Sequence, residues 1–262
     1  MISLKPYLFF AVMLVLSPCY SGLQAQNIPD SLLKKLAAVS SDSAKGITLL
    51  EIGESIEVAD PEKSMEYYEQ ALATGQRIKN SRVILSSYYD IGVCYINLNK
   101  MDSSISFLEA AIPFARLLND TLSEAKLLGI IGNAWLHKKD RFTAIEFYLK
   151  SARIWETCSN QQYLTLLYSN INALLDEQKE HTRALEFGNK AIELAKKIGD
   201  KYSLVNGLVN LSTTYSHLGQ HEKEYEMLEQ ALPLAKDNKD LDQIATVYHN
   251  MGDYYFEKND FS

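Results

Sequence analysis

The chain has 262 residues, of which 47% are apolar and 23% are charged. These proportions exclude an intrinsically disordered chain, because the apolar residues suffice to build a core. With 26 basic and 33 acidic residues the formal charge is −7, so the basic footprint of a nucleic-acid-binding protein is missing. The 12 glycines and 6 prolines are too few for the many tight turns of an all-β fold, and the composition therefore predicts a helical protein.

The first residues predict a secretory signal peptide. Lys5 supplies a positive charge, residues 7–16 are an unbroken apolar run, and a short segment of small and polar residues ends at Ala25. This order is typical of signal peptides, and the run is too short for a bilayer, which needs about 20 helical residues. We therefore expect residues 1–25 to be removed and the mature protein to be exported, either in the periplasm or on a membrane and facing the periplasm.

Two alternatives to simple cleavage stay open. The segment Leu16-Ser17-Pro18-Cys19 resembles a bacterial lipobox, although Pro18 stands where Gly, Ala or Ser is usual. In that case Cys19 is lipidated and anchors the chain to a membrane surface. In the other alternative the apolar run is a buried N-terminal helix. The remaining cysteines, Cys94 and Cys158, lie too far apart for a disulfide framework, and we expect two free, mostly buried thiols.

Residues 27–41 predict a leading helix with one polar face. From about residue 60 onward the sequence repeats every 40 residues, and the first unit, which begins at residue 42, is one residue shorter. In each unit a small residue follows an aliphatic one and precedes, by three positions, a large one, which is the spacing of one helix face. A second helix follows, also built around small residues. The small positions of the first helix are Gly92, Gly132, Asn172, Ser212 and Gly252, and those of the second are Ser64, Ser104, Ala144 and Ala184, with Glu224 as the exception.

The period divides the chain into five units and a part of a sixth: 42–80, 81–120, 121–160, 161–200, 201–240 and 241–262. Asn or Asp stands at every junction, where it favours a turn and caps the next helix: Asn80, Asp120, Asn160, Asp200 and Asp240. The last unit stops early and leaves Met251, Tyr255 and Phe256 without a partner helix. We interpret the sequence as a piece of a longer protein; the alternative is a natural end that is exposed or dimerises.

The units resemble the tetratricopeptide repeat. The first-helix segments IGVCY, IGNAW and MGDYY and the second-helix segments SMEYYEQAL, AIEFYLKSA and ALEFGNKAI carry its pattern. The usual unit has about 34 residues, and this 40-residue unit is similar to the variant in kinesin light chains and many bacterial sensory proteins. The resemblance implies an all-α fold of tandem antiparallel helical hairpins in a right-handed superhelix (an α-solenoid). Asn172, Ser212 and Glu224 depart from the pattern, and we expect a local packing cost there.

The resemblance also implies that the first helices line a concave groove. In several proteins of this family an Asn just before the aliphatic–small pair binds the backbone of an extended peptide, because a carboxamide offers both donors and an acceptor. The alternative is that such residues make local caps or hydrogen bonds between helices. Here the column reads Asp90, Ile130, Asn170, Asn210 and Asn250. Further groove candidates are Tyr89, Lys126, Asn133, His137, Asp176, Glu177, Thr213, His217, His249 and Asp253.

Motifs for catalysis and for cofactors are missing from the sequence. We find neither a Gly-rich phosphate loop nor a Gly-x-Ser-x-Gly nucleophile motif. Zinc needs three or four converging ligands, and the spacing of the histidines and cysteines predicts no such cluster. The histidines are His137, His181, His217, His221 and His249. We therefore expect no metal, no cofactor and no enzyme activity in this segment.

These features favour an exported module that binds a peptide or protein in its concave groove. By resemblance, such a module is the N-terminal sensory or scaffold region of a larger bacterial protein, either a histidine kinase or a helix-turn-helix regulator. Two alternatives are a self-contained periplasmic or lipid-anchored scaffold and a region that presents substrate to a larger enzyme. We expect no nucleic-acid partner, and membrane contact only through a lipid anchor or a downstream helix.

Overall fold

The computed structural model describes residues 28–158 and 161–258, and all regular secondary structure in these ranges is helical. The signal peptide and the lipidation site at Cys19 lie outside the described residues. The twelve described helices are α1 (Asp30–Ala38), α2 (Asp42–Ile56), α3 (Pro61–Ile78), α4 (Ser81–Asn97), α5 (Met101–Leu117), α6 (Thr121–His137), α7 (Arg141–Trp155), α8 (Gln161–Glu177), α9 (His181–Ile198), α10 (Lys201–His217), α11 (His221–Asn238) and α12 (Leu241–Glu257).

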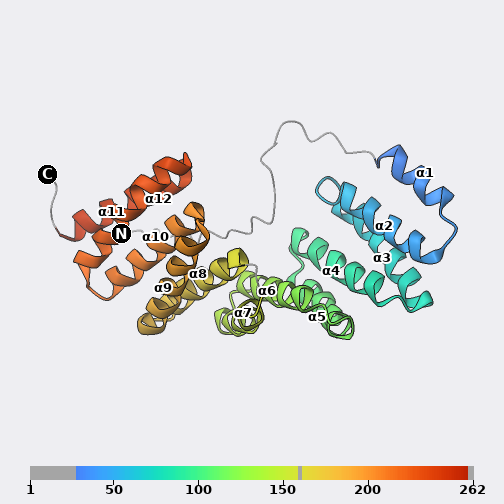
Figure 1. The fold of residues 1–262 in the computed structure, drawn as a ribbon, viewed down its shortest axis with the longest axis horizontal. Helices are drawn as coiled ribbons and strands as arrows, with labels where there is room; N and C mark the ends of the chain where they lie inside the picture. Colours follow the sequence, from blue (N-terminus) through green and yellow to red (C-terminus); the bar gives the residue numbers. More distant parts are fainter. Residues whose placement is uncertain (1–27, 159–160, 259–262) are drawn as a thin grey trace.

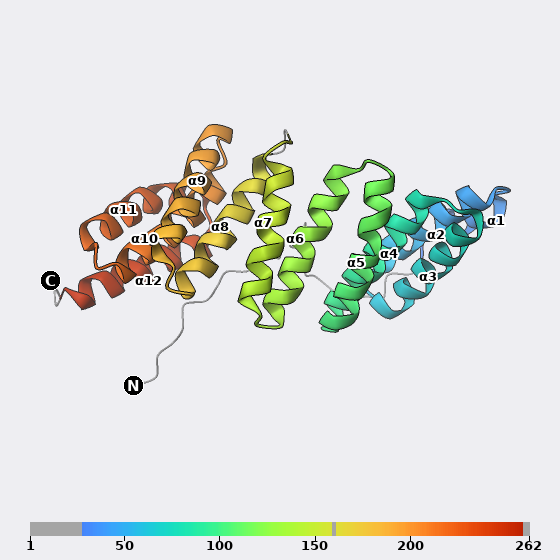
Figure 2. The same cartoon turned by 90° about the horizontal axis from the view of Figure 1, so that it is seen from below.

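The helices form antiparallel pairs that stack in chain order into an arch (Figure 1). Helix α1 packs on α2 at one end, and α12 packs on α11 at the other. Neighbouring first helices of the pairs, such as α8 and α10, contact each other more extensively than neighbouring second helices do. First helices therefore lie on the inner side of the curve. The all-α solenoid of helical hairpins is confirmed, and Figure 2 shows the pairs following each other along its length.

The junctions between units are built from local caps. The side chains of Asn80, Asp120, Asp200 and Asp240 accept hydrogen bonds from the first-turn backbone N–H groups of the next helix, as predicted. In each case the residue just before the cap has left-handed backbone, which ends the previous helix. Asn160 lies outside the described residues. At each junction the left-handed residue ends one helix and the Asn or Asp begins the next, so the units join through tight corners without long loops.

In units 81–120 and 121–160 the glycine of the first helix lies against one side chain from the second helix of the same unit. A Cβ at Gly92 would lie 2.6 Å from Cγ of Leu108, and a Cβ at Gly132 would lie 2.7 Å from the ring of Tyr148. Such distances are below normal contact, so only glycine permits this close approach. Unit 161–200 reverses the sizes: the bulky Asn172 faces Gly188, whose Cβ position lies 3.1 Å from the Asn172 amide nitrogen. The larger side chain of Asn172 is thus compensated by the absence of a side chain at Gly188, 16 positions later.

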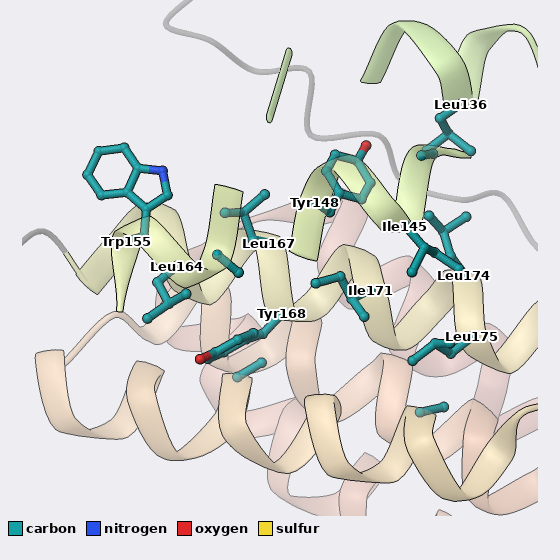
Figure 3. Packing of buried hydrophobic residues seen from close by; sticks show 14 of the residues in the cluster. Leu136, Ile145, Tyr148, Trp155, Leu164, Leu167, Tyr168, Ile171, Leu174 and Leu175 are labelled. Atoms are coloured by element: carbon teal, nitrogen blue, oxygen red, sulfur yellow. The ribbon is translucent and has the colours of Figure 1, made fainter. Parts of the chain in front are cut away.

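The largest buried cluster lies in the middle of the arch, between α6 and α9 (Figure 3). Trp155 and Tyr148 are each only 1% exposed, and Ile171 and Leu174 are fully buried. Each pair packs on the next, and buried hydrophobic clusters follow one another along the stack. Cys94 is buried and Cys158 half-buried, and both are free thiols, as predicted. Over the described ranges, no helix is long and apolar enough to cross a membrane.

Candidate functional site

The predicted Asn column lies on the inner helices, but its members differ in their surroundings. Ile130 is 3% exposed and belongs to the core. The amide of Asn210 donates to the backbone carbonyl of Ser169 at 3.4 Å, which is the inter-helix role left open by the sequence. Among the described residues, the half-buried side chains of Asn170 and Asn250 make no hydrogen bond. Only these two carboxamides therefore keep all their donors and acceptors for a ligand.

The remaining member of the column, Asp90, lies in an acidic group at the α2–α4 end of the inner surface. Burial raises the pKa of its carboxyl to about 8, and the nearby charges of Glu57 and Glu54 add to the effect. Burial also raises the pKa of Glu57, which accepts hydrogen bonds from the Tyr68 hydroxyl at 2.8 Å and from the Asn97 amide at 3.4 Å. Sequence reasoning missed Glu57, Tyr68 and Asn97 because they come from three separate places in the chain: the turn after α2, helix α3 and the end of α4.

The electrostatics of this acidic group favour a cation. At neutral pH the Asp90 carboxyl keeps its proton, because ionising it next to Glu57 in a poorly solvated position is costly. A positive charge beside both groups would remove that cost. Burial likewise raises the pKa of the neighbouring Tyr89 hydroxyl. The group therefore suits the side chain of a Lys or Arg better than an anion.

Some of the other predicted groove residues make hydrogen bonds within the protein, and others are exposed. Asn133 accepts a hydrogen bond from the Tyr148 hydroxyl at 2.5 Å, and the Thr213 hydroxyl donates to the Val209 carbonyl at 3.3 Å. The Asn133 contact joins α6 to α7, whereas the Thr213 contact lies within α10. The exposed residues of the predicted set are Lys126, His137, Glu177, His217, His249 and Asp253. Glu177 forms an ion pair with Arg141, and Nε2 of His249 lies 3.5 Å from a carboxylate oxygen of Asp253.

One prediction is wrong: two of the five histidines, His181 and His217, do converge with a carboxylate. Asp176 is 6% exposed, and its two carboxylate oxygens lie 2.7 Å from Nδ1 of His181 and 2.7 Å from Nδ1 of His217. The sequence predicted Asp176 as a groove residue. It is buried because the next unit stacks over it. The signal that could have found the cluster is the separation of 36 residues between His181 and His217, which recurs in two ion pairs between units: Asp102–Lys138 and Arg141–Glu177.

Comparison with known proteins identifies the class of repeat. Residues 162–237 and 85–112 match sequence profiles of the tetratricopeptide repeat. Both segments are therefore repeats of this family, and the helix pairs on either side continue the same architecture. No curated protein sequence matches the chain.

Several solved structures are similar to the chain. One is the signal transduction ATPase with numerous domains (STAND) PH0952 from Pyrococcus horikoshii, which has a tetratricopeptide repeat sensor; the identity is 16%, the TM-score 0.77, and the match covers 88% of this chain but only 36% of that one. The apo form of RapI matches with 15% identity and a TM-score of 0.67, over 87% and 81% of the two chains. YrrB, a repeat protein with an unusual peptide-binding site, matches with 15% identity and a TM-score of 0.60, over 85% and 98%. These likenesses show the fold.

Proposed function

We propose that this chain is an exported tetratricopeptide repeat module that binds an extended peptide or protein segment on its inner surface. The observation that carries the proposal is the pair of unpaired carboxamides, Asn170 and Asn250, on inner helices of the stack. A free carboxamide pairs with a peptide unit through both a donor and the acceptor, so it binds backbone of any sequence. YrrB, a protein of similar fold, has a peptide-binding site, which supports peptide binding as the function.

The acidic group around Asp90 and Glu57 sets the charge of the preferred ligand. Two carboxyl groups in a poorly solvated position gain most from a cation that arrives with the ligand. The chain as a whole is also acidic, with a formal charge of −7, which attracts positively charged ligands over longer range. The proposed ligand is therefore a peptide or protein segment with at least one Lys or Arg near the end that contacts α2 and α4.

The proposed place of this module is the N-terminal sensory or scaffold region of a larger bacterial protein, such as a histidine kinase or helix-turn-helix regulator. The sensor repeats of the STAND protein support this, since the chain matches 36% of that longer protein. The segment itself has no enzyme activity in this proposal. The alternatives are a self-contained periplasmic or lipid-anchored scaffold and a substrate-presenting region of an enzyme. Mass spectrometry of the exported chain separates two cases: an N-terminus at Gln26 supports release, and a lipid on Cys19 supports the anchored scaffold.

A binding experiment tests the groove. Peptides selected from a random displayed library against the whole chain are labelled, and their Kd values are measured by fluorescence anisotropy. Replacing both Asn170 and Asn250 by Ala removes two sets of neutral hydrogen bonds worth about 0.5–1.5 kcal/mol each, so we expect Kd to rise about 5- to 150-fold. Asn189→Ala is the matched control, because this exposed Asn lies on a second helix, α9. Equal Kd values for all three proteins would exclude the inner surface as the site.

A further inference from the structure

We infer that Asp176, His181 and His217 form a binding site for a divalent transition-metal ion such as Zn²⁺. The three side chains come from the last turn of α8, the first residue of α9 and the last residue of α10. Their ligand atoms all lie within 4.8 Å of one another. Two imidazole nitrogens and one carboxylate oxygen are the ligand types that zinc prefers, and three protein ligands are the usual number when a fourth position stays open.

The repeat geometry explains why these residues meet. Stacking places the first residue of a second helix beside the last residue of the following first helix, 36 positions later. At the preceding step these positions hold the ion pair Arg141–Glu177, and at the following step they hold His221 and Glu257, 3.8 Å apart. Between them, the same two positions hold two histidines with ring centroids 5.6 Å apart. Two basic groups side by side have no reason to stabilise each other unless an anion or a metal ion joins them.

The third ligand replaces a core residue. One period before Asp176 stands Leu136, which is 8% exposed and packs in the core. A carboxylate in such a position is expensive to desolvate unless it is paired. Here both of its oxygens face imidazole nitrogens at 2.7 Å. The backbone also supports the arrangement, because the Asp176 carbonyl accepts a hydrogen bond from Lys179, whose left-handed conformation turns the chain back to His181.

The exposure of the three ligands predicts an open coordination position. Asp176 is buried and His181 is 21% exposed, whereas 49% of the His217 side chain is exposed. Solvent or a donor group of a bound protein can therefore reach an ion from the His217 side. Since Asp176 and His181 belong to one unit and His217 to the next, an ion at this site would also join two units. Metal binding should therefore stabilise the stack against unfolding.

A second group of possible ligands provides an internal comparison. Nδ1 of His221 lies 3.0 Å from a carboxylate oxygen of the buried Glu224 and 3.8 Å from one of Glu257. This group has the same number of donors, yet only one of them is an imidazole. Glu257 is also about half exposed. We therefore expect the site at Asp176 to bind zinc more tightly than the group at His221.

The experiment uses the whole chain, stripped with a chelator and titrated with ZnCl₂ by isothermal calorimetry, and with CoCl₂ by visible absorption. We expect one tight Zn²⁺ per chain, a tetrahedral Co²⁺ spectrum and a rise in Tm with Zn²⁺. His217→Ala should weaken zinc binding by at least about 100-fold, since losing even an outer-shell partner costs about 10- to 100-fold. His249→Ala is the control, because this exposed histidine also has a carboxylate neighbour but lies outside the cluster.

Two results would overturn the site: no 1:1 binding of Zn²⁺ or Co²⁺ by the wild-type chain, or a Kd for zinc that His217→Ala leaves unchanged. Circular dichroism checks that each variant is folded. If His217→Ala unfolds the chain, Asp176→Asn is measured instead. It keeps the side-chain size and removes the anionic ligand, so it should also lose the tight zinc binding. Binding lost in Glu257→Gln but not in Asp176→Asn would place the metal at the His221 group and contradict the assignment.

Discussion

The close contact between Gly132 and Tyr148 allows a sharp test of how the helices of one unit pack. A methyl group at residue 132 would lie 2.7 Å from two ring carbons of Tyr148 and 3.3 Å from the Ala144 carbonyl oxygen. The ring has little freedom to move, because it is 1% exposed and its hydroxyl is held by Asn133 at 2.5 Å. The substitution Gly132→Ala therefore forces either the ring or the two helices apart.

The expected loss follows from two opposing effects. Overpacking a filled core costs typically about 1–3 kcal/mol, and the rigid surroundings of Tyr148 place this case near the upper end. Replacing Gly by Ala within a helix gains about 1 kcal/mol. We expect a net loss of about 1–2 kcal/mol in the free energy of unfolding. The Tm, followed by circular dichroism, should then fall by several degrees.

Gly252 supplies the matched control. It occupies the same position of the repeat, three periods after Gly132, but a Cβ there meets no atom within 4 Å of the described structure. Gly252→Ala should therefore keep the gain in helix propensity and raise the stability by up to about 1 kcal/mol. The packing argument would be refuted if the Gly132→Ala variant were as stable as the wild type, or if both variants lost the same free energy of unfolding.

Two further predictions concern the pair Asn172 and Gly188 and the carboxyl group of Asp90. A Cβ at Gly188 would lie 2.7 Å from Leu211 and 3.1 Å from Asn172, so Gly188→Tyr should cost about 1–3 kcal/mol by overpacking. The part of this loss that is due to Asn172 should vanish in the double variant with Asn172→Gly; chemical denaturation of all four proteins gives the coupling energy, and simple additivity would contradict an exchange of volumes between residues 172 and 188. The Asp90 carboxyl has a pKa of about 8 in the folded state and an ordinary value of 3.8. Between pH 3.8 and 8 the folded state therefore binds one more proton than the unfolded state, and the free energy of unfolding falls as the pH rises through this range. Asp90→Asn should therefore gain stability relative to the wild type as the pH rises from about 5 to 9; a difference independent of pH would show that Asp90 is ordinarily solvated.

The sequence alone determined the unit and its local rules. A strict 40-residue period and the 3.6-residue spacing of small and bulky positions were enough to predict the helix pairs and their stacking. The Asn and Asp residues at the junctions act as the predicted caps wherever the structure describes them, for example Asn80 and Asp200. These features are predictable because each depends on residues close together in the chain.

Contacts between units and exchanges of size within a unit were decided by the tertiary structure. Whether Asn210 reaches Ser169, and whether Asp176 lies between two histidines, depends on the offset at which one hairpin stacks on the next. No single unit encodes that offset. Similarly, the bulk of Asn172 was visible in its column, but the space provided by Gly188 became apparent only when the two helices faced each other. Periodicity shows which face of a helix is buried, and packing decides what that face contacts.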